Sequence, residues 1–409
     1  MKTVIVIGDG MADNPVEALG GKTPLEAADI PVMDALAGAG EVGHAQTVPR
    51  GVPPGSDTAI LSIFGYDPRQ YFSGRAPLEA AGAGVPLKAG DVAYRCNMVA
   101  LEDGEMPFEE KKILSHSGGS VEGEVALALM DALLGDARFA ACAEKHGVRF
   151  YPSDSFRHIA VQGGAEVKGL ATVGPHDHLG QAQGGLLPTG CAAAAGLCEL
   201  MALAHEILQE HPLNAERRRA GKLPANGLWF WAQGVALGLP SFEKEHGVRG
   251  FVVSAVPLVQ GIGALAGMDV VCVPGATGEL DTNYEGKANA VVKGLADGYD
   301  FALLHVEAPD ECTHNGDTPG KLQAIEWLDS RCIARVVAGL REAGEAFRIL
   351  VLSDHKTLTS TRGHDGDPVP YILYKSDAEA HSGRAYTERE AEMGPYIPAG
   401  HRLVRRLLG

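Results

Sequence analysis

The sequence predicts an α/β fold with a largely parallel sheet flanked by helices, interrupted by an inserted α+β domain. Three observations lead to this prediction: short β-branched runs, helical periodicity between most of them, and a middle segment with a different pattern. The length of 409 residues exceeds what one hydrophobic core usually holds, so about two or three domains are expected.

Short β-branched runs predict buried strands. They occur at residues 3–7, 250–255, 269–273, 301–306, 349–352 and 369–374. Between most of these runs, apolar residues recur at three- and four-residue spacing, which predicts helices at residues 25–39, 287–296 and 322–343. Because strands and helices alternate, we expect the strands to pair mainly in parallel.

The middle of the chain carries another pattern. Its expected elements are strands at 94–101 and 156–161, a helix at 121–134 and an alanine-rich helix from residue 191. The basic segment 216–226 is typical of an exposed turn or linker. We therefore expect an inserted domain at 91–225, while residues 1–90 and 226–409 join into one core domain.

Composition narrows the possible partners. Hydrophobic residues make up 45% and charged residues 21% of the chain, and the net charge is -17. An acidic chain has no general attraction for nucleic acids or anionic membranes, so we predict neither as a partner. The seven cysteines include no CxxC pair, which argues against a disulfide framework and a structural zinc cluster.

No segment has the pattern of a targeting or membrane-spanning sequence. The N-terminal run is too short for a signal peptide. The most apolar stretch, residues 191–208, is interrupted by Glu199, His205 and Glu206, which favours a helix of a soluble protein. We predict a cytoplasmic protein, and the sequence leaves its oligomeric state open.

Acidic and imidazole side chains follow several predicted strands. In parallel α/β sheets, sites form at the carboxyl ends of the strands. Each residue alone could be a turn or capping residue, but a mixture of carboxylates and imidazoles suits Mn²⁺, Mg²⁺ or Zn²⁺. The residues at these strand ends are Asp9, Asp310, His314, Asp354, His355 and His364.

Their spacing is compatible with two metal ions. Asp310 and His314 are four residues apart, so one helical turn would place them on the same side. Asp354 and His355 are adjacent and would point in different directions from an extended segment. Two metal ions about 4 Å apart could hold a phosphoryl group and its attacking oxygen.

Ser56 lies at a predicted helix start, between "VPPG" and an apolar run. It could cap that helix, or it could be a nucleophile activated by a base or a metal. A phosphate would also be stabilised at this position by the free N–H groups of the helix. Both interpretations place Ser56 at the start of the helix. They differ only in whether its hydroxyl caps the helix or attacks phosphorus.

Several motifs carry a resemblance to a known family. They are "GDGMAD", "PPGSDTAILSIFGYDP", "SGRAPLEAAGAG", "YRCNMV", "PGATGELDTNYEGKA", "DECTH" and "SDH…GHDGDPVPYILY". Together they resemble the archaeal-type 2,3-bisphosphoglycerate-independent phosphoglycerate mutases of the alkaline phosphatase superfamily, in the family's order and over nearly the whole chain. The resemblance implies an alkaline-phosphatase-like core with an inserted substrate-binding lid.

The resemblance also implies roles for individual residues. Ser56 would become phosphoserine during transfer of the phosphoryl group of 3-phosphoglycerate to the other hydroxyl, and Lys287 would lie near that group. The cofactors would be two divalent ions, Mn²⁺ or Mg²⁺, with Zn²⁺ and Co²⁺ as alternatives. One ion would be surrounded by Asp9, Ser56, Asp354 and His355, and the other by Asp310, His314 and His364.

The same resemblance suggests Arg75, Arg95 and Arg157 as ligands of the substrate's carboxylate and phosphate, since guanidinium pairs with both. Surface or interdomain ion pairs are the alternative for each arginine. Three more residues, with structural roles as the alternative, are candidates for facing the substrate: His158, His176 and Asp177.

Two departures from the family's usual pattern leave other functions open. The segment "SDHKTLTSTRGHDGD" lacks a proline that commonly follows its threonine, and Asn315 stands where aspartate is frequent. Related chains resemble homoserine kinases, so a phosphotransfer to homoserine is one alternative, although no P-loop is present. A phosphatase or sulfatase-like hydrolase and a non-catalytic binding protein are the others.

Overall fold

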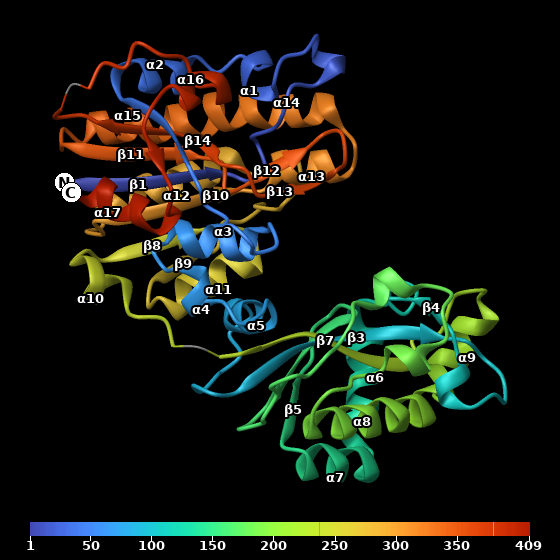
Figure 1. Ribbon diagram of the computed structural model, residues 1–409. Coiled ribbons are helices and arrows are strands. Elements are labelled where there is room, and N and C mark those ends of the chain that lie inside the picture. Colours follow the sequence, from blue (N-terminus) through green and yellow to red (C-terminus); the bar gives the residue numbers. More distant parts are fainter. Residues whose placement is uncertain (237, 379) are drawn as a thin grey trace. The chain divides into compact units, whose positions relative to one another are not determined.

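The computed structural model describes residues 1–236, 238–378 and 380–409, which form two compact units, each with its own hydrophobic core (Figure 1). The first unit comprises Met1–Phe72 and Gly238–Gly409. The second unit begins at Ser73, ahead of the predicted boundary at residue 91. It does so because α5 (Ala76–Gly82) packs against the strands of that unit.

The first unit is built on one eight-stranded sheet, which confirms the predicted α/β class. All six predicted strands are in it. Its strands, in spatial order, are β15 (Tyr396–Ile397), β2 (Glu41–Ala45), β14 (Val369–Lys375), β11 (Phe347–Leu352), β1 (Lys2–Gly8), β10 (Phe301–Val306), β8 (Gly250–Val253) and β9 (Asp269–Val271). From β11 to β9 all neighbours are parallel, whereas β14 is antiparallel to both β11 and β2.

The central strand β1 is buried on both faces, as its continuous apolar run predicts. Val4 and Val6 belong to the core formed with α2 (Pro31–Ala39), α12 (Tyr284–Ala296) and α15 (Ala334–Glu342). Ile5 and Ile7 point to the opposite face, which is covered by the helices α3 (Ser56–Ile63), α11 (Pro257–Leu265) and α17 (Leu403–Leu408) (Figure 1). The central strands of the sheet therefore lie buried between two helical layers, whereas the edge strands β9 and β15 are partly exposed.

Two predicted helices are divided. The pattern at residues 25–39 forms α1 (Pro24–Ala27) and α2, because Pro31 starts a new helix and disfavours a helical conformation at the residue before it. The pattern at 322–343 forms α14 (Thr318–Trp327), a π-helical segment η5 (Leu328–Ile333) and α15. Sequence periodicity did not reveal this π segment, because apolar spacing continues through it.

The second unit contains an antiparallel sheet with helices on it. The sheet is formed by β3 (Val92–Leu101), β4 (Ile113–Ser115), β5 (Val148–Tyr151), β6 (Arg157–Gln162) and β7 (Gly227–Val235). The helices are α6 (Gly123–Gly135), α7 (Ala137–Lys145), α8 (Ala192–Gln209) and α9 (Pro212–Arg219). The prediction of a turn or linker at 216–226 is wrong at its start, because α9 continues through Arg219.

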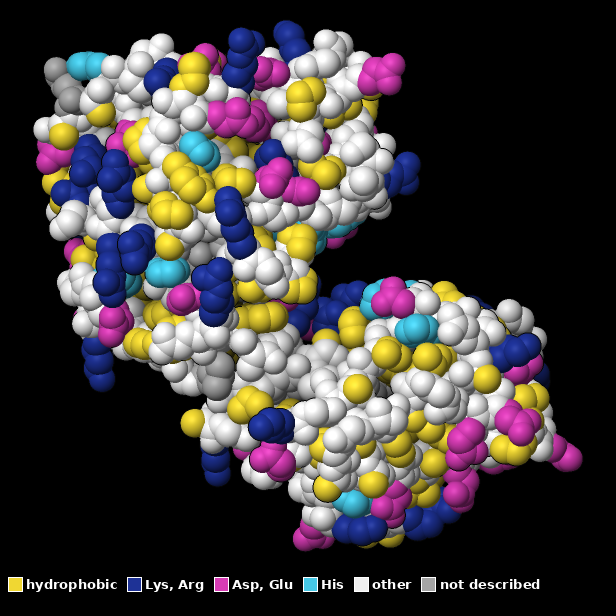
Figure 2. Space-filling model, in the orientation of Figure 1, with side chains coloured by type: hydrophobic (Ala, Val, Ile, Leu, Met, Phe, Trp, Pro, Cys, Tyr) yellow, Lys and Arg dark blue, Asp and Glu magenta, His cyan; other side chains and the backbone are white. Residues whose placement is uncertain are grey.

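The remaining elements are short. They are α4 (Pro68–Tyr71), α10 (Phe242–His246), α13 (Ala308–His314), α16 (Glu388–Glu392), β12 (Lys356–Leu358), β13 (Gly363–Asp365), and the 3-10 turns at Glu17–Leu19, Phe108–Glu110, Pro175–His178, Gln183–Leu186 and Gly400–Arg402. Among the described residues, no helix combines the length and apolarity that crossing a membrane requires. On the face shown in Figure 2, acidic and basic side chains are interspersed over both units.

Candidate active site

The predicted site residues of the first unit gather at one edge of its sheet. The four neighbouring strands β11, β1, β10 and β8 are parallel, so their carboxyl ends meet at this edge. Asp9 follows β1, and Asp310 lies in α13 just after β10. Asp354 and His355 follow β11 directly. The topology thus brings together residues that are more than 340 positions apart in the chain.

The first group consists of Asp9, Asp354 and His355, whose potential ligand atoms lie within 4.8 Å of one another. All three residues are buried. His355 Nε2 lies 3.2 Å from Asp354 Oδ2 and 3.6 Å from Asp9 Oδ1. Ser56 Oγ joins this group, at 3.2 Å from His355 Nε2.

The hydrogen bonds around this group leave the His355 Nε2 lone pair facing carboxylate oxygens, so that acceptors lie opposite acceptors. Thr357 Oγ1 donates to Asp310 Oδ1 at 2.6 Å, so at its 3.2 Å contact with His355 Nδ1 it must accept the imidazole proton. His355 Nε2 then presents a lone pair to Asp9 Oδ1 and Asp354 Oδ2. Both carboxylate oxygens are buried, and neither has a hydrogen-bond partner among the described residues. This arrangement is costly unless a cation is bound there, so these residues fit a metal ion.

Charge crowding has the same consequence for Asp9. Burial, together with the charges of Asp354 and Asp310, raises the pKa of Asp9 well above its ordinary value. A divalent cation between these carboxylates would relieve that repulsion and favour their ionised forms.

The second group consists of Asp310, His314 and His364, again with ligand atoms within 4.8 Å of one another. The Nε2 atoms of the two imidazoles are 2.9 Å apart. His314 Nε2 lies 3.1 Å from Asp310 Oδ2, and His364 Nε2 lies 3.5 Å from Asp310 Oδ1. As the sequence spacing predicted, the four-residue separation of Asp310 and His314 on α13 places them on one side of the helix.

The hydrogen bond of His314 Nδ1 indicates which ring nitrogen could bind a metal ion. His314 Nδ1 donates to the backbone carbonyl of Arg362 at 2.8 Å, so Nε2 is left as the inward-facing acceptor. Metal-ligating histidines are commonly held by such a carbonyl. In the absence of a cation, the hydrogen bond to Asp310 raises the pKa of His314 to about 9, and a metal ion would displace that proton.

Two residues that the sequence analysis missed hold the groups in place. Thr357 links Asp310 to His355 through its hydroxyl, and His305 Nε2 lies 2.9 Å from Asp9 Oδ2. His305 points inward from β10, where an apolar run gave no functional signal. The position of Thr357 two residues after His355 was the only available clue to its role.

Glycine is needed at position 10 because the two candidate ligand groups leave no space for a side chain there. Its φ is +59°, which disfavours other residues. A Cβ atom at this position would lie 2.3 Å from Thr357 Oγ1 and 2.6 Å from Asp310 Oδ1. The amide of Gly10 also donates to Asp354 Oδ1 at 3.1 Å.

Ser56 is the first residue of α3, and it is not the helix cap. The N-cap is Gly55, and no side chain caps this helix. The hydroxyl of Ser56 contacts His355 instead of a backbone amide of α3. Of the two interpretations drawn from the sequence, capping is therefore the wrong one.

Lys287 lies in α12 and is buried, with 1% of its surface exposed. Its ammonium donates to the backbone carbonyls of Thr277 and His305, at 3.4 and 3.3 Å. Burial lowers the pKa of Lys287 to about 8. The exposed-helix alternative for this lysine is thus wrong, and its charge lies beside the β10 end of the site.

The three predicted arginines belong to the second unit, including Arg75, which the sequence analysis had assigned to the core domain. Arg75 Nε and Arg95 Nε donate to the two oxygens of Glu79, at 2.8 and 2.6 Å. Arg95 also stacks on Trp231, 4.7 Å from the ring centroid. Arg157 lies over the ring of Phe156 at 5.1 Å.

The weaker histidine candidates differ from one another. His158 is buried, and its Nδ1 accepts the backbone N–H of Ser153 at 3.1 Å, which is a structural role. His176 is exposed and packs against Trp231, with ring centroids 5.1 Å apart. His176 Nε2 lies 3.6 Å from the carboxylate of its neighbour Asp177.

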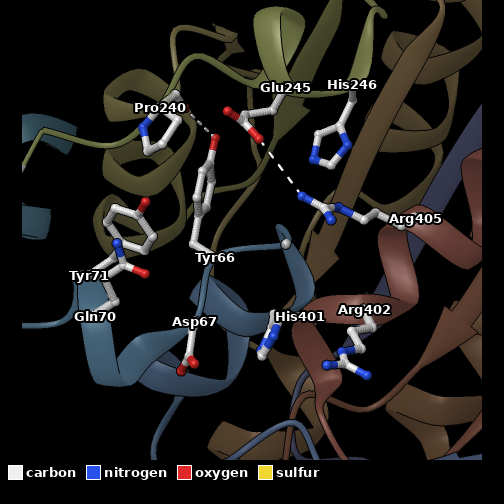
Figure 3. A pocket seen from close by; sticks show the side chains of 11 residues that line it. Tyr66, Asp67, Gln70, Tyr71, Pro240, Glu245, His246, His401, Arg402 and Arg405 are labelled. Atoms are coloured by element: carbon white, nitrogen blue, oxygen red, sulfur yellow. Dashed lines mark hydrogen bonds and ion pairs between the residues drawn. The ribbon is translucent and has the colours of Figure 1, made fainter.

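A cavity of about 340 Å³ in the first unit contains none of these residues (Figure 3). Tyr66 and Tyr71 lie on one side of it, and His401 and Arg402 lie on another. The Tyr66 hydroxyl donates to the carbonyl of Pro240 at 2.7 Å. The candidate active site is therefore defined by the strand ends and not by this cavity.

Comparisons with known proteins indicate the family of this chain. A family model described as 2,3-bisphosphoglycerate-independent phosphoglycerate mutase matches residues 37–214. A relative of that name from Methanosarcina acetivorans is 46% identical over 396 residues, covering 96% of this chain and 95% of its own. Another, from Methanothrix thermoacetophila, is 43% identical over 410 residues and covers both chains completely.

Solved structures share the fold. A protein from Pyrococcus horikoshii has a TM-score of 0.81 at 31% identity, with 100% of this chain and 96% of the other covered. A cofactor-independent phosphoglycerate mutase from Thermoplasma acidophilum has a TM-score of 0.65 at 24% identity, with both chains fully covered.

The fold and the site define the class of protein: an α/β enzyme with two groups of candidate metal ligands beside a serine at the carboxyl edge of a parallel sheet. Within this class, the chain belongs to the 2,3-bisphosphoglycerate-independent phosphoglycerate mutase family.

Proposed function

We propose that this protein interconverts 3-phosphoglycerate and 2-phosphoglycerate through a phosphoserine at Ser56, without 2,3-bisphosphoglycerate. The observation that carries the proposal is the position of Ser56 Oγ, 3.2 Å from His355 Nε2 and beside the group of Asp9, Asp354 and His355. The names of the full-length relatives support the choice of substrate.

The proposed cofactors are two divalent cations, Mn²⁺ or Mg²⁺. Asp9, Ser56, Asp354 and His355 would hold one, and Asp310, His314 and His364 would hold the other. When bound, these cations would supply positive charge that activates the serine hydroxyl and neutralises phosphoryl oxygens. The mixture of carboxylate and imidazole ligands suits these metals.

The local structure suits Ser56 to carry a phosphoryl group. Because Ser56 is the first residue of α3, the unpaired N–H groups and the positive end of the helix dipole face an anion on its Oγ. In the first transfer, a bond forms between Ser56 Oγ and phosphorus while the bond from phosphorus to the substrate's ester oxygen breaks. In the second transfer, the phosphorus moves from Ser56 Oγ to the other hydroxyl of glycerate.

The roles of the second unit are part of the same proposal. Arg75, Arg95 and Arg157 would bind the carboxylate and phosphate of the substrate, and Glu79 would orient the first two. As a lid, the unit would keep water away from the phosphoserine, since water would convert a mutase into a phosphatase.

The test is an enolase-coupled assay with 3-phosphoglycerate and no bisphosphoglycerate. Protein treated with a chelator should be inactive, and Mn²⁺ or Mg²⁺ should restore turnover. Ser56→Ala should reduce turnover by about 10³-fold or more. The matched control is Ser62→Ala on the same helix, because the Ser62 hydroxyl has no hydrogen-bond partner.

Two results would contradict the proposal. Near wild-type turnover by Ser56→Ala would exclude the phosphoserine. Release of inorganic phosphate at the rate of substrate loss, without formation of 2-phosphoglycerate, would identify a hydrolase instead.

A further inference from the structure

A second kind of candidate ligand cluster lies within the second unit. Cys142 in α7, His146 at the end of the same helix and Glu199 in α8 form the cluster. Their potential ligand atoms lie within 4.8 Å of one another. α7 and α8 pack side by side in this unit (Figure 1).

The helix geometry explains why the three side chains converge. Cys142 and His146 are four residues apart, so they lie on the same face of α7. His146 Nε2 lies 2.7 Å from Glu199 Oε2. The imidazole rests on α8 where Gly196 lacks a side chain, since a Cβ there would lie 2.5 Å from His146 Nδ1. Gly196 therefore leaves the space that brings His146 to Glu199.

We propose that Cys142, His146 and Glu199 form a binding site for a borderline divalent cation of the Zn²⁺ type. Thiolate, imidazole and carboxylate are the three ligand types that Zn²⁺ takes in proteins. Three protein ligands leave one tetrahedral position for water, as in sites that bind a metal reversibly or use it chemically. The three candidate groups in the first unit, the third being Asp9, His305 and Glu307, contain no thiol, so the thiolate sets this site apart.

The charges balance when the cation binds. Cys142 releases its thiol proton to solvent and binds as thiolate, while His146 binds through Nε2 as the neutral imidazole. With Glu199, the two anionic ligands then neutralise the cation. Lys145 Nζ, now 2.9 Å from Glu199 Oε2, has a 61% exposed side chain and can turn into water.

An ordinary ion-pair network is the competing explanation. Lys145 and His146 both contact Glu199, and such a surface network needs no metal. In that network the Cys142 thiol, which is 6% exposed, acts only as a hydrogen-bond donor to Glu199, whereas a metal site would use its sulfur as a ligand. In the part of the chain that the structure covers, no other cysteine belongs to a comparable group.

The experiment titrates Co²⁺ into the full-length protein with Mn²⁺ in large excess, because Co²⁺ would otherwise displace Mn²⁺ from the carboxylate and imidazole groups of the first unit. A Co²⁺–thiolate bond produces a near-ultraviolet charge-transfer band that Asp and His ligands do not give. We expect this band to saturate at one Co²⁺ per chain and Zn²⁺ to abolish it by competition. Cys142→Ser should remove the band, while Cys272→Ser should retain it, because Cys272 is an exposed free thiol.

Two further variants keep the thiol and test the geometry. His146→Asn and Gly196→Ala should each weaken Co²⁺ binding by about tenfold or more, the first by removing a ligand and the second by displacing it. Absence of the band in the wild type, or an unchanged band in Cys142→Ser, would overturn the proposal. Unchanged affinity in both His146→Asn and Gly196→Ala would also overturn it, by leaving only the ion-pair network.

Discussion

Two acidic sites, one in each unit, differ in whether their carboxylates have hydrogen-bond donors. In the second unit, the carboxylate of Glu79 receives hydrogen bonds from both Arg75 and Arg95. In the first unit, Asp9 Oδ1 and Asp354 Oδ2 are buried without a partner and face the lone pair of His355. A carboxylate whose oxygens have donors needs no further partner, whereas acceptors that face acceptors require an additional cation.

The pKa shifts of Glu79 and Asp9 differ in the same way as their hydrogen bonding. Burial alone would raise the pKa of Glu79, but hydrogen bonds and charges from Arg95 and Arg75 lower it below its ordinary value. For Asp9, burial and neighbouring carboxylates act in the same direction and raise the pKa. Four predictions use this comparison, starting with the largest expected effect.

The first prediction concerns the cation itself. His364→Ala should lower the metal content by about one ion per chain and turnover by about 10³-fold, because it leaves Asp310 and His314 as the only ligands of their group. Elemental analysis after gel filtration measures the first effect. His401→Ala, at the cavity of Figure 3, is the control and should change neither quantity. Unchanged metal content in His364→Ala would remove this group as a metal site.

The second prediction concerns the space between the two groups. Gly10→Ala should lower the free energy of unfolding by about 2–5 kcal/mol. The strain of an alanine at positive φ adds to the steric overlap of its Cβ with Thr357. Native-state hydrogen exchange of the β1 amides gives this free energy of unfolding. Gly21→Ala is the matched control, since Gly21 has φ +79° and nothing within 4 Å of its Cβ. Gly21→Ala should lower the free energy of unfolding by only about 1 kcal/mol. Equal losses in both variants would mean that the two candidate ligand groups are not tightly packed around Gly10.

The third prediction concerns His158, a buried histidine of the second unit. Burial lowers the pKa of His158 to about 4, below the value of about 6.5 expected in the unfolded chain. The unfolded chain therefore binds more protons between these values, and stability is lost as the pH falls from 6.5 to 4. The loss should approach about 3 kcal/mol at pH 4.

Urea unfolding followed by tryptophan fluorescence can measure this loss, since Trp229 and Trp231 both lie in the second unit. His158→Gln keeps an acceptor for the Ser153 amide but does not titrate, so its stability should change less over this pH range. Equal pH dependence in the variant and the wild type would assign the effect to other groups.

The fourth prediction compares a partly buried ion pair with an exposed one. Glu79→Gln should cost about 1–3 kcal/mol, because the side chain of Arg95 is only 12% exposed and would lose its charged partner. Asp297→Asn breaks the exposed pair with Lys293 and should stay within about 0.5 kcal/mol. Similar urea midpoints for the two variants would show that the Glu79 pairs contribute no more than a surface pair.

Much of the site could be predicted because its residues are tied to strand ends. Asp9, Asp354 and His355 directly follow β-branched runs, so the position of each strand also gave the position of its ligand. Asp310 and His314 were linked by helical spacing. By contrast, His305 lies inside a continuous apolar strand, and its function depends on which neighbour β10 pairs with.

The sequence by itself determined the α/β class, the strand positions and the types of ligand, because periodicity and residue chemistry are local properties. Tertiary structure alone decided which acceptors face each other, that the Ser56 hydroxyl contacts His355, and that Cys142 and His146 meet Glu199. The physical reason is that these facts depend on distances between segments far apart in the chain, which strand order and helix packing set.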